Sequence, residues 1–402
     1  MAEVLVAMSG GVDSAVAAGL LIEQGHRVTG VHLKLADLPL DEQVSGHGCC
    51  TLDDAQDARR SAQVLGIPFY VWDLSERFAA EVQAPFAATY ARGATPNPCV
   101  TCNERVKYAG LLERARALGF DALATGHHAR LRRGGARVTE PGPGVSLHRA
   151  ADRRKDQSYV LYVATAEQLA ATLLPVGEHV KDEVRRLATA WNLRVADKPD
   201  SYDVCFIPDG DTAGYLATQL APAPGPIVDV EGAEVGRHDG VWRYTVGQRR
   251  GLGLAGAHAS GADRPEPRYV VEVDAASATV VVGARELLAC RRIEVADPSW
   301  VAGRAPSGPV RVQVRAHGAS VPARVEAVLG DVPEAVPGDG SEDGPGAAVR
   351  LHLDVAVHGV ATGQAAVVYD VEDVHCLGGG RITGAQRPSI RERDRSTSDG
   401  AG

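Results

Sequence analysis

The stretch Ser9-Gly10-Gly11 most constrains how this chain can fold, because it lies between a short apolar run and a helical pattern. Val4-Leu5-Val6 predicts a buried strand, and the residues from Ser14 onward predict a helix. A glycine-rich turn at this junction lets the backbone approach a ligand closely. It also points free N–H groups and the positive end of a helix dipole toward that ligand. The segment therefore predicts an anion-binding strand–loop–helix unit, with an ordinary tight turn as the alternative.

The same alternation of apolar runs and helical patterns continues through the first half of the chain. Strands are expected at 4–8, 27–32, 68–72 and 121–124, and helices at 14–24, 53–65, 74–83, 105–118, 166–174 and 181–191. This βαβα order predicts an α/β fold with a doubly wound parallel sheet. Ligands of such sheets bind at the carboxyl ends of the strands.

The pattern changes at the Pro/Gly-rich stretch 221–226, beyond which helical periodicity nearly disappears. Short Val-rich strands are expected at 241–246, 269–273, 279–282, 310–314, 347–355 and 364–368. We therefore expect a catalytic domain over 1–219, a small β-rich domain over 220–284, a β-barrel-like domain over 285–384 and a disordered tail over 385–402.

Composition and charge narrow the class of protein. We expect a cytoplasmic protein with no membrane partner, because no basic leader precedes the first apolar run and no apolar run could cross a bilayer. The net charge of −9 argues against a generally basic nucleic-acid binder, yet it leaves room for a local basic surface. Arginines cluster at 130–137, 149–154 and 249–250. These clusters could bind phosphate groups, or they could simply be solvent-exposed faces.

Five of the seven cysteines lie within the expected catalytic domain, residues 1–219, and this favours catalysis or metal binding over a disulfide framework. Two prolines precede Cys102, and a helix is expected to begin near Glu104. A thiol near a helix N-terminus ionises readily and is a good nucleophile. A structural thiol or half of a zinc site is the alternative. Cys205 follows a polar loop and could equally be structural.

The loop Ser9-Gly10-Gly11-Val12-Asp13-Ser14 lacks the lysine of the common ATPase loop. It resembles instead the pyrophosphate loop of ATP pyrophosphatases, which adenylate a carbonyl oxygen. With further motifs it resembles one family, the bacterial tRNA-specific 2-thiouridylases, from Met8 to about Ile382. Those motifs are Gly48-Cys49-Cys50, Asn97-Pro98 with Cys102-Asn103, Gly126-His127 with Ala129-Arg130, Asp156 to Tyr159, Ser201 with Cys205-Phe206-Ile207, Tyr244-Thr245 with Gly247-Gln248-Arg249, Gly363-Gln364-Ala365 and Cys376 to Gly380.

The resemblance implies a reaction and its partners. ATP, with Mg²⁺, would adenylate the C2 carbonyl oxygen of the wobble uridine in tRNAs for Lys, Glu and Gln. A cysteine desulfurase or sulfur-relay protein would load a persulfide onto Cys205. That sulfur would attack C2 with the help of Cys102, leaving a Cys102–Cys205 disulfide.

The resemblance also implies binding residues. ATP contacts fall on Ala7, Met8, Ser9, Gly10, Gly11, Val12, Asp13, Ser14, Leu33 and Gly126. Contacts to tRNA fall on Asn97, Pro98, Cys99, His127, His128, Lys155, Asp156, Gln157, Arg315, Ala316 and Gln364.

Cys99 departs from the family, many members of which have Asp there, and a thiol cannot replace a carboxylate that accepts hydrogen bonds from a base edge. Three thiols, Cys99, Cys102 and Cys205, could instead hold a labile iron–sulfur cluster. Two other functions stay open: an ATP pyrophosphatase ligase acting on a small molecule, and a catalytically idle RNA-binding adaptor.

Overall fold

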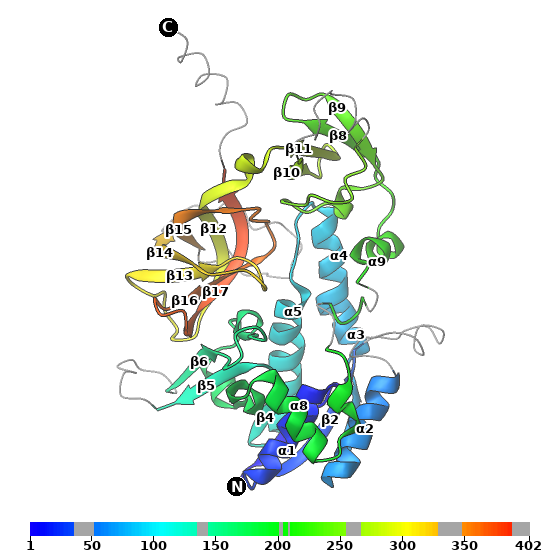
Figure 1. Cartoon of the computed structure of the whole chain (residues 1–402), viewed down its shortest axis with the longest axis vertical. Coiled ribbons are helices and arrows are strands. Elements are labelled where there is room, and N and C mark those ends of the chain that lie inside the picture. Colours follow the sequence, from blue (N-terminus) through cyan, green and yellow to red (C-terminus); the bar gives the residue numbers. More distant parts are fainter. Residues whose placement is uncertain are drawn as a thin grey trace.

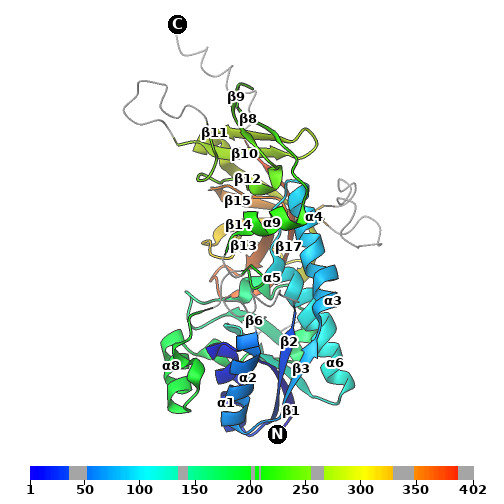
Figure 2. The same ribbon diagram turned by 90° about the vertical axis from the view of Figure 1, so that its right-hand side faces the viewer.

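The computed structural model describes residues 1–35, 52–134, 144–200, 204–207, 210–254, 267–328 and 348–387. The chain forms three sheets. In space, the α/β domain lies at one end of the molecule and a small sheet at the other, and a barrel lies on one side between them (Figures 1 and 2). Cys49 and Cys50 lie outside the described residues. Within the described ranges, no helix combines the length and the apolar character needed to cross a membrane.

The N-terminal sheet is parallel, as predicted. Its strands are β1 (Glu3–Ala7), β2 (Arg27–Lys34), β3 (Phe69–Asp73), β4 (Ala122–Thr125) and β7 (Thr172–Leu173), in the order β3-β2-β1-β4-β7. Along β1, Val4 and Val6 pack under α1 (Val12–Glu23) and α2 (Leu52–Leu65), whereas Leu5 packs into a second core on the other face. Helices therefore cover both faces, because successive strand side chains point to opposite sides.

The helix that carries Cys102 begins earlier than expected. It starts with α5 (Pro98–Thr101), continues through π-helical turns over Cys102–Leu112 and ends in α6 (Glu113–Ala117). The side-chain oxygen of Asn97 caps it by accepting from the N–H groups of Cys99 (3.1 Å) and Val100 (3.4 Å). The expected start near Glu104 is therefore wrong; Asn at the N-cap followed by Pro is the start signal.

Other boundaries of the first domain also differ from expectation. The helix expected over 74–83 is α3 (Ser75–Phe78) with π-helical turns to Gln83, and α4 (Ala84–Ala91) extends it. The helix expected over 166–174 ends at Ala170, because the next residues form strand β7. The remaining helices are α8 (Lys181–Ala190), α9 (Thr212–Gln219) and the 3₁₀ turns Ser158–Val160, Pro175–Glu178, Arg194–Asp197, Val241–Arg243 and Arg285–Leu288.

The middle module is a four-stranded sheet of β8 (Gly225–Asp229), β9 (Glu234–His238), β10 (Tyr269–Asp274) and β11 (Thr279–Gly283), in the order β10-β11-β8-β9. The strand expected at 241–246 is wrong, because Val241–Arg243 is a 3₁₀ turn. Its apolar residues are nevertheless buried. Val241 and Tyr244 pack in the core of the middle module, and Trp242 packs in the cluster that contains Cys102, without joining a strand ladder.

The last six strands close into the expected barrel. They are β12 (Ala289–Trp300), β13 (Pro309–Gln313), β14 (Val321–Val328), β15 (Ala348–His358), β16 (Ala365–Tyr369) and β17 (His375–Gln386), and β12 pairs with both β15 and β17. Strand β17 contains Ala385 and Gln386, so the tail does not begin at 385. Residues 388–402, where most of the expected tail lies, are outside the described part.

A hairpin from the first half of the chain extends the barrel sheet, which the sequence did not predict. Strands β5 (Ala129–Arg133) and β6 (Val145–Arg149) pair with each other, and β6 pairs with β17 through His148 and His375. Arg149 fixes this junction, since its buried guanidinium bonds Asp156 at 2.8 Å and also reaches Gln313 and Asp373. The first domain and the barrel therefore share a sheet.

Candidate nucleotide and sulfur-transfer site

The loop between β1 and α1 can be formed only with glycine at position 10. Gly10 has φ +84°, and a Cβ on it would lie 2.3 Å from the carbonyl oxygen of Asp54 on α2. The hydroxyl of Ser14 accepts from the N–H of Ser9 at 3.2 Å and donates to the carbonyl of Gly11 at 3.1 Å. The sequence thus folds this stretch into a tight loop at the N-terminus of α1, as expected of an anion-binding turn.

Gly126, which follows β4, closes the loop from the neighbouring strand. A Cβ at Gly126 would lie 2.6 Å from the backbone nitrogen of Ser14 and 2.8 Å from the carbonyl carbon of Asp13. The residues expected to bind ATP at 7–14 and at 126 are therefore brought together. Leu33, on the adjacent strand β2, is buried in the core against which Ala7 packs.

The carboxylate of Asp13 lies between two basic groups. One oxygen is 3.0 Å from Nε2 of His128, and the two oxygens accept from Nζ of Lys181 at 2.8 and 2.7 Å. Burial alone would raise the pKa of Asp13, but the hydrogen bond and charge of His128, with those of Lys181, lower it overall. Asp13 is therefore held as a carboxylate at the start of α1.

Two lysines to which the sequence analysis gave no role connect the segment before Cys205 to the loop between β1 and α1, which we call the nucleotide loop. Lys181, with a side chain only 8% exposed, also pairs with Asp200 at 2.8 Å. Lys198 donates to the carbonyl of Gly10 at 3.1 Å and pairs with Asp54 and Asp57 on α2. Sequence reasoning assigned neither lysine a role, because the contacts join segments far apart in the chain.

The thiols expected to transfer sulfur belong to one apolar cluster. Cys102 is buried within it, and half-buried Cys205 packs against it. Phe206 anchors the Cys205 segment through edge contacts with Phe78, Phe86 and Tyr215, at centroid distances of 5.5, 5.3 and 5.2 Å. The cluster also includes Leu33 and Leu35 from the carboxyl end of β2, and it extends to Tyr369 and Cys376 of the barrel.

Half-buried Cys99 lies in the first turn of α5, one turn before Cys102. Over the residues that the structure describes, no three His, Cys, Asp or Glu side chains come together as metal ligands. The three thiols are therefore not gathered as a ligand set there.

Several residues expected to contact tRNA make contacts within the protein. His127 is bonded to Thr125 at 2.7 Å, and burial together with the charges of Lys107 and His128 holds its pKa well below the usual value. Buried Asp156 accepts from Arg149 and from the N–H of Ala150. The side chain of exposed Gln157 accepts from the N–H of His128 at 2.9 Å. The contacts of His127 and His128 fix the loop after β4, which His128 also joins to Asp13.

The remaining expected contacts lie on three elements. Lys155 pairs with Asp200 at 2.6 Å, and Asn97 and Pro98 begin α5. Arg315, Ala316 and Gln364 lie on loops of the barrel. Nε2 of Gln364 donates to the carbonyl of Thr95 at 2.9 Å, which brings the barrel loop to within two residues of Asn97.

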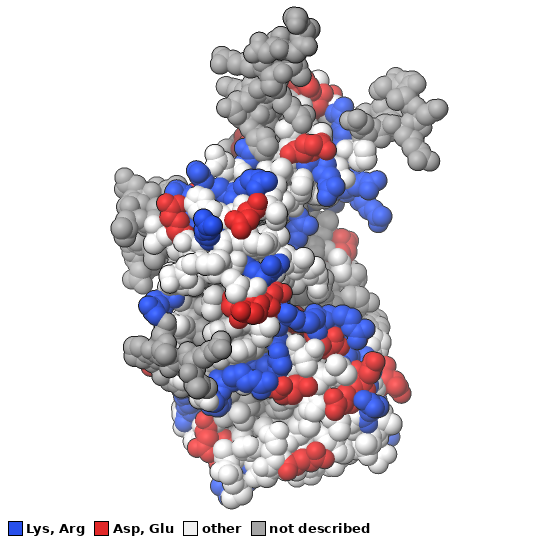
Figure 3. Space-filling view, turned by 60° about the vertical axis from the view of Figure 1, so that its left-hand side comes forward, with Lys and Arg blue, Asp and Glu red and all other residues white. Residues whose placement is uncertain are grey.

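Many of the clustered arginines also make contacts within the protein. Arg132 pairs with Glu178, Arg133 donates to the carbonyls of Ala170 and Thr172, and Arg154 pairs with Asp152. The face drawn in Figure 3 carries Lys and Arg side chains mainly across its middle, with Asp and Glu interspersed. Over the described residues, basic and acidic side chains are therefore mixed on this face, with no continuous basic surface.

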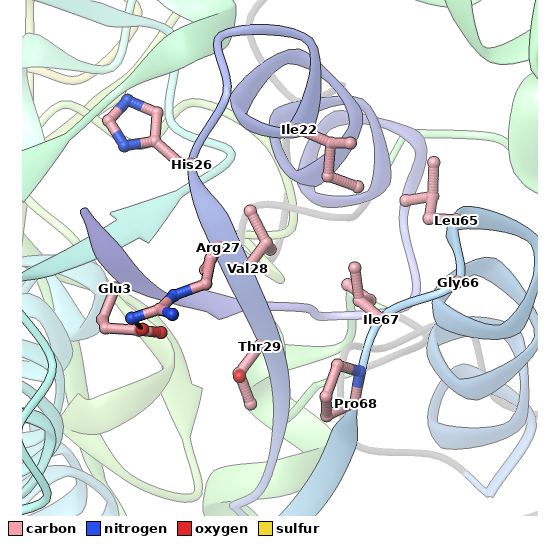
Figure 4. Close-up of a pocket in the computed structure, with 10 residues that line it drawn as sticks. All are labelled: Glu3, Ile22, His26, Arg27, Val28, Thr29, Leu65, Gly66, Ile67 and Pro68. Carbon is pink, nitrogen blue, oxygen red and sulfur yellow. Dashed lines mark ion pairs between the residues drawn. The ribbon is translucent and has the colours of Figure 1, made fainter. Parts of the chain in front are cut away.

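A hollow of about 460 Å³ lies at the opposite edge of the N-terminal sheet. Glu3 and Arg27, which form an ion pair, are the first residues of β1 and β2, and both line it (Figure 4). The nucleotide loop follows the carboxyl end of β1 instead. The described residues that line the hollow thus include none of those expected to bind ATP.

The chain matches three family descriptions along its length. Residues 2–209 match a "tRNA methyl transferase HUP domain", residues 213–284 a "tRNA methyl transferase PRC-barrel domain" and residues 342–382 an "Aminomethyltransferase beta-barrel domain". The "tRNA-specific 2-thiouridylase MnmA" of Acidothermus cellulolyticus is 49% identical over 96% of this chain and 99% of its own length. The protein of the same name from Beutenbergia cavernae is 51% identical over 91% of each chain. Because these relatives match it at about half identity over nearly the full length, this chain belongs to the tRNA-specific 2-thiouridylase family.

Proposed function

We propose that this protein is an ATP-dependent tRNA 2-thiouridylase that acts on the wobble uridine. One observation carries the proposal. Ala7, where the nucleotide loop begins, packs against the same apolar cluster that holds Cys102 and Cys205. The loop and the two thiols therefore border one continuous apolar core. The names of relatives that match nearly the full chain support the same activity.

The loop fits a pyrophosphate group. Gly10 and Gly126 let the loop pack closely against Asp54 and against the turn after β4, and the N–H groups at the start of α1 are the groups that would bind an anion. ATP would bind here with its phosphates on the loop. Leu33 would contact the adenine. Mg²⁺ is expected to enter with ATP, because Mg²⁺ in such sites is bound largely through substrate phosphates.

The proposed chemistry has three steps. The C2 oxygen of uridine first attacks the α-phosphate of ATP, and pyrophosphate leaves. This step activates C2, because AMP is a far better leaving group than the carbonyl oxygen. The terminal sulfur of a Cys205 persulfide then attacks C2 and displaces AMP. Finally the Cys102 thiolate attacks Sγ of Cys205. The S–S bond to the transferred sulfur breaks, 2-thiouridine is released and a Cys102–Cys205 disulfide remains.

A reconstituted reaction tests the proposal. The purified protein is given ATP, Mg²⁺, unmodified glutamate tRNA and a cysteine desulfurase with cysteine, and the digested nucleosides are read by mass spectrometry. We expect 2-thiouridine that requires ATP and disappears in Cys205→Ser, while binding of ATP and tRNA is kept. The matched control is Cys290→Ala, a buried thiol of strand β12. Pyrophosphate release without a thiolated nucleoside would favour the small-molecule ligase instead.

A further inference from the structure

Motifs from three parts of the chain meet at Thr95, in the loop between α4 and α5. The N–H of Thr95 donates to the carbonyl of Thr362 at 2.8 Å, and its carbonyl accepts from Gln364 at 2.9 Å. Its hydroxyl lies 3.0 Å from the hydroxyl of Thr245. The side chain of Thr95 is 9% exposed. The first domain, the middle module and the barrel therefore all contact one residue.

The barrel loop lies directly on the backbone of Thr95. Gly363 has φ +88°, and a Cβ there would lie 3.0 Å from both the carbonyl carbon and the carbonyl oxygen of Thr95. Only glycine allows this approach at this backbone conformation. The Gly363-Gln364 motif thus fastens the barrel to the loop that precedes α5.

The turn Thr245–Gln248 of the middle module touches both neighbours. Besides its contact with Thr95, Thr245 lies near the hydroxyl of Tyr90 at the end of α4. A Cβ on Gly247 would lie 3.1 Å from Cα of Gly359 and 3.7 Å from the guanidinium of Arg315. Arg315 in turn donates to the carbonyl of Gly359 at 2.7 Å. The turn therefore lies between the thiol-bearing domain and the barrel loop of Arg315.

The other side of Thr95 leads to the thiols. Pro96, with its fixed φ, joins Thr95 to Asn97, and the side chain of Asn97 caps the helix that carries Cys99 and Cys102. Because this connection is stiff, a displacement of Thr95 would also shift the start of the helix that carries Cys102.

We propose that Thr95 and Thr245 form a positioning joint that sets the Cys102 helix relative to the barrel loops of Arg315 and Gln364. Engagement of RNA by those loops then fixes the distance between the uridine and Cys102. This inference rests on the proposed function. Thr95 acts through Asn97 and the helix, so it is a positioning residue and does not contact the reacting atoms.

The test removes the hydroxyls and keeps the shapes. We compare Thr95→Val, Thr245→Val and the double variant with Thr95→Ser, which keeps the hydroxyl. The matched control is Ser320→Ala, an equally buried hydroxyl of the barrel that bonds Asp373 and does not contact Thr95. We expect kcat for tRNA thiolation to fall roughly tenfold in each Val variant, since misplacement on the order of 1 Å can cost more. KM for ATP and for tRNA should stay within about twofold, because uniform binding is retained.

Two further results separate positioning from a merely structural role. The double variant should be no worse than the poorer single variant, because both remove the same contact, and Thr95→Ser should recover most of the activity. Additive losses, no loss, or an equal loss in Ser320→Ala would overturn the proposal.

A readout without tRNA tests the joint independently of the proposed function. Cys102 is 6% exposed, so its alkylation by iodoacetamide requires local opening. We expect Thr95→Val to raise the Cys102 alkylation rate roughly tenfold and Ser320→Ala to leave it unchanged. An unchanged rate in Thr95→Val would overturn the joint. Absence of thiolation by the wild-type protein would instead overturn the proposed function.

Discussion

Replacing Lys181 with Met should destabilise the N-terminal domain far more than the same change at an exposed lysine. The ammonium of Lys181 is almost fully buried and bridges Asp13 of the nucleotide loop and Asp200. Met keeps the aliphatic stem and removes the charge. The matched control is Lys34→Met, whose partner Asp73 is 3.1 Å away and exposed.

The size of the effect follows from the remaining partners. Removing one partner of a buried ion pair costs about 3–5 kcal/mol. Here Asp13 keeps His128, and Asp200 keeps Lys155 and Arg185, so we expect a smaller loss, about 2–3 kcal/mol. The exposed pair of Lys34 should be worth about 0–1 kcal/mol. For a domain of this size the difference between the two variants, about 1–3 kcal/mol, corresponds to roughly 2–12 °C in Tm.

Calorimetry and urea denaturation over a range of pH provide the assay. The folded-state pKa values of Asp13 and Asp200 are lowered, that of Asp200 to about 2. For Asp200, burial acts in the opposite direction and the bonds and charges of Lys155 and Lys181 prevail. Stabilisation from such carboxylates is complete above the unfolded pKa of 3.8 and is lost as pH falls through the folded value. The gap between wild type and Lys181→Met should therefore be constant near neutral pH and shrink between about pH 4 and pH 2. A loss no larger than that of Lys34→Met, or a gap that stays constant into acid, would refute the reasoning.

Three other outcomes are expected. Gly126→Ala should weaken ATP binding roughly ten- to hundredfold in calorimetric titration, because its Cβ would overlap the backbone of the loop and overpacking costs about 1–3 kcal/mol; unchanged affinity would contradict the placement of the nucleotide. Arg149→Met should cost about 3–5 kcal/mol in urea denaturation, because it leaves buried Asp156 without its cation; a loss under about 1 kcal/mol would mean that the shared sheet does not depend on it. His148 stacks on His375 at 4.9 Å, and burial with the charge of His375 lowers the pKa of His148 to about 4. Stability from this neutral pair should be complete above pH 6.5 and fall toward pH 4, and His148→Phe should flatten that slope in Tm measurements; an equally steep slope in the variant would exclude the pair as its source.

Local patterns predicted the elements whose signals are local. The alternation of Val4, Leu5 and Val6 and the glycine turn after them determined β1, the loop and the direction of α1. The barrel was expected from short Val-rich runs. The start of the Cys102 helix was missed because Pro98 was read only as a stiffening residue. The strand expected at 241–246 failed because buried apolar side chains do not require a ladder.

The sequence by itself determined the strand–loop–helix unit, the parallel sheet and the thiol motifs, because each depends on residues close together in the chain. Only the tertiary structure decided which distant groups complete the site. Lys181 meets Asp13, Lys198 meets Gly10, and Thr95 joins Thr245 and Gln364 across separate modules. Such contacts leave no periodicity in the sequence, because burial and charge pairing select partners by their distance in the folded protein and not by their spacing along the chain.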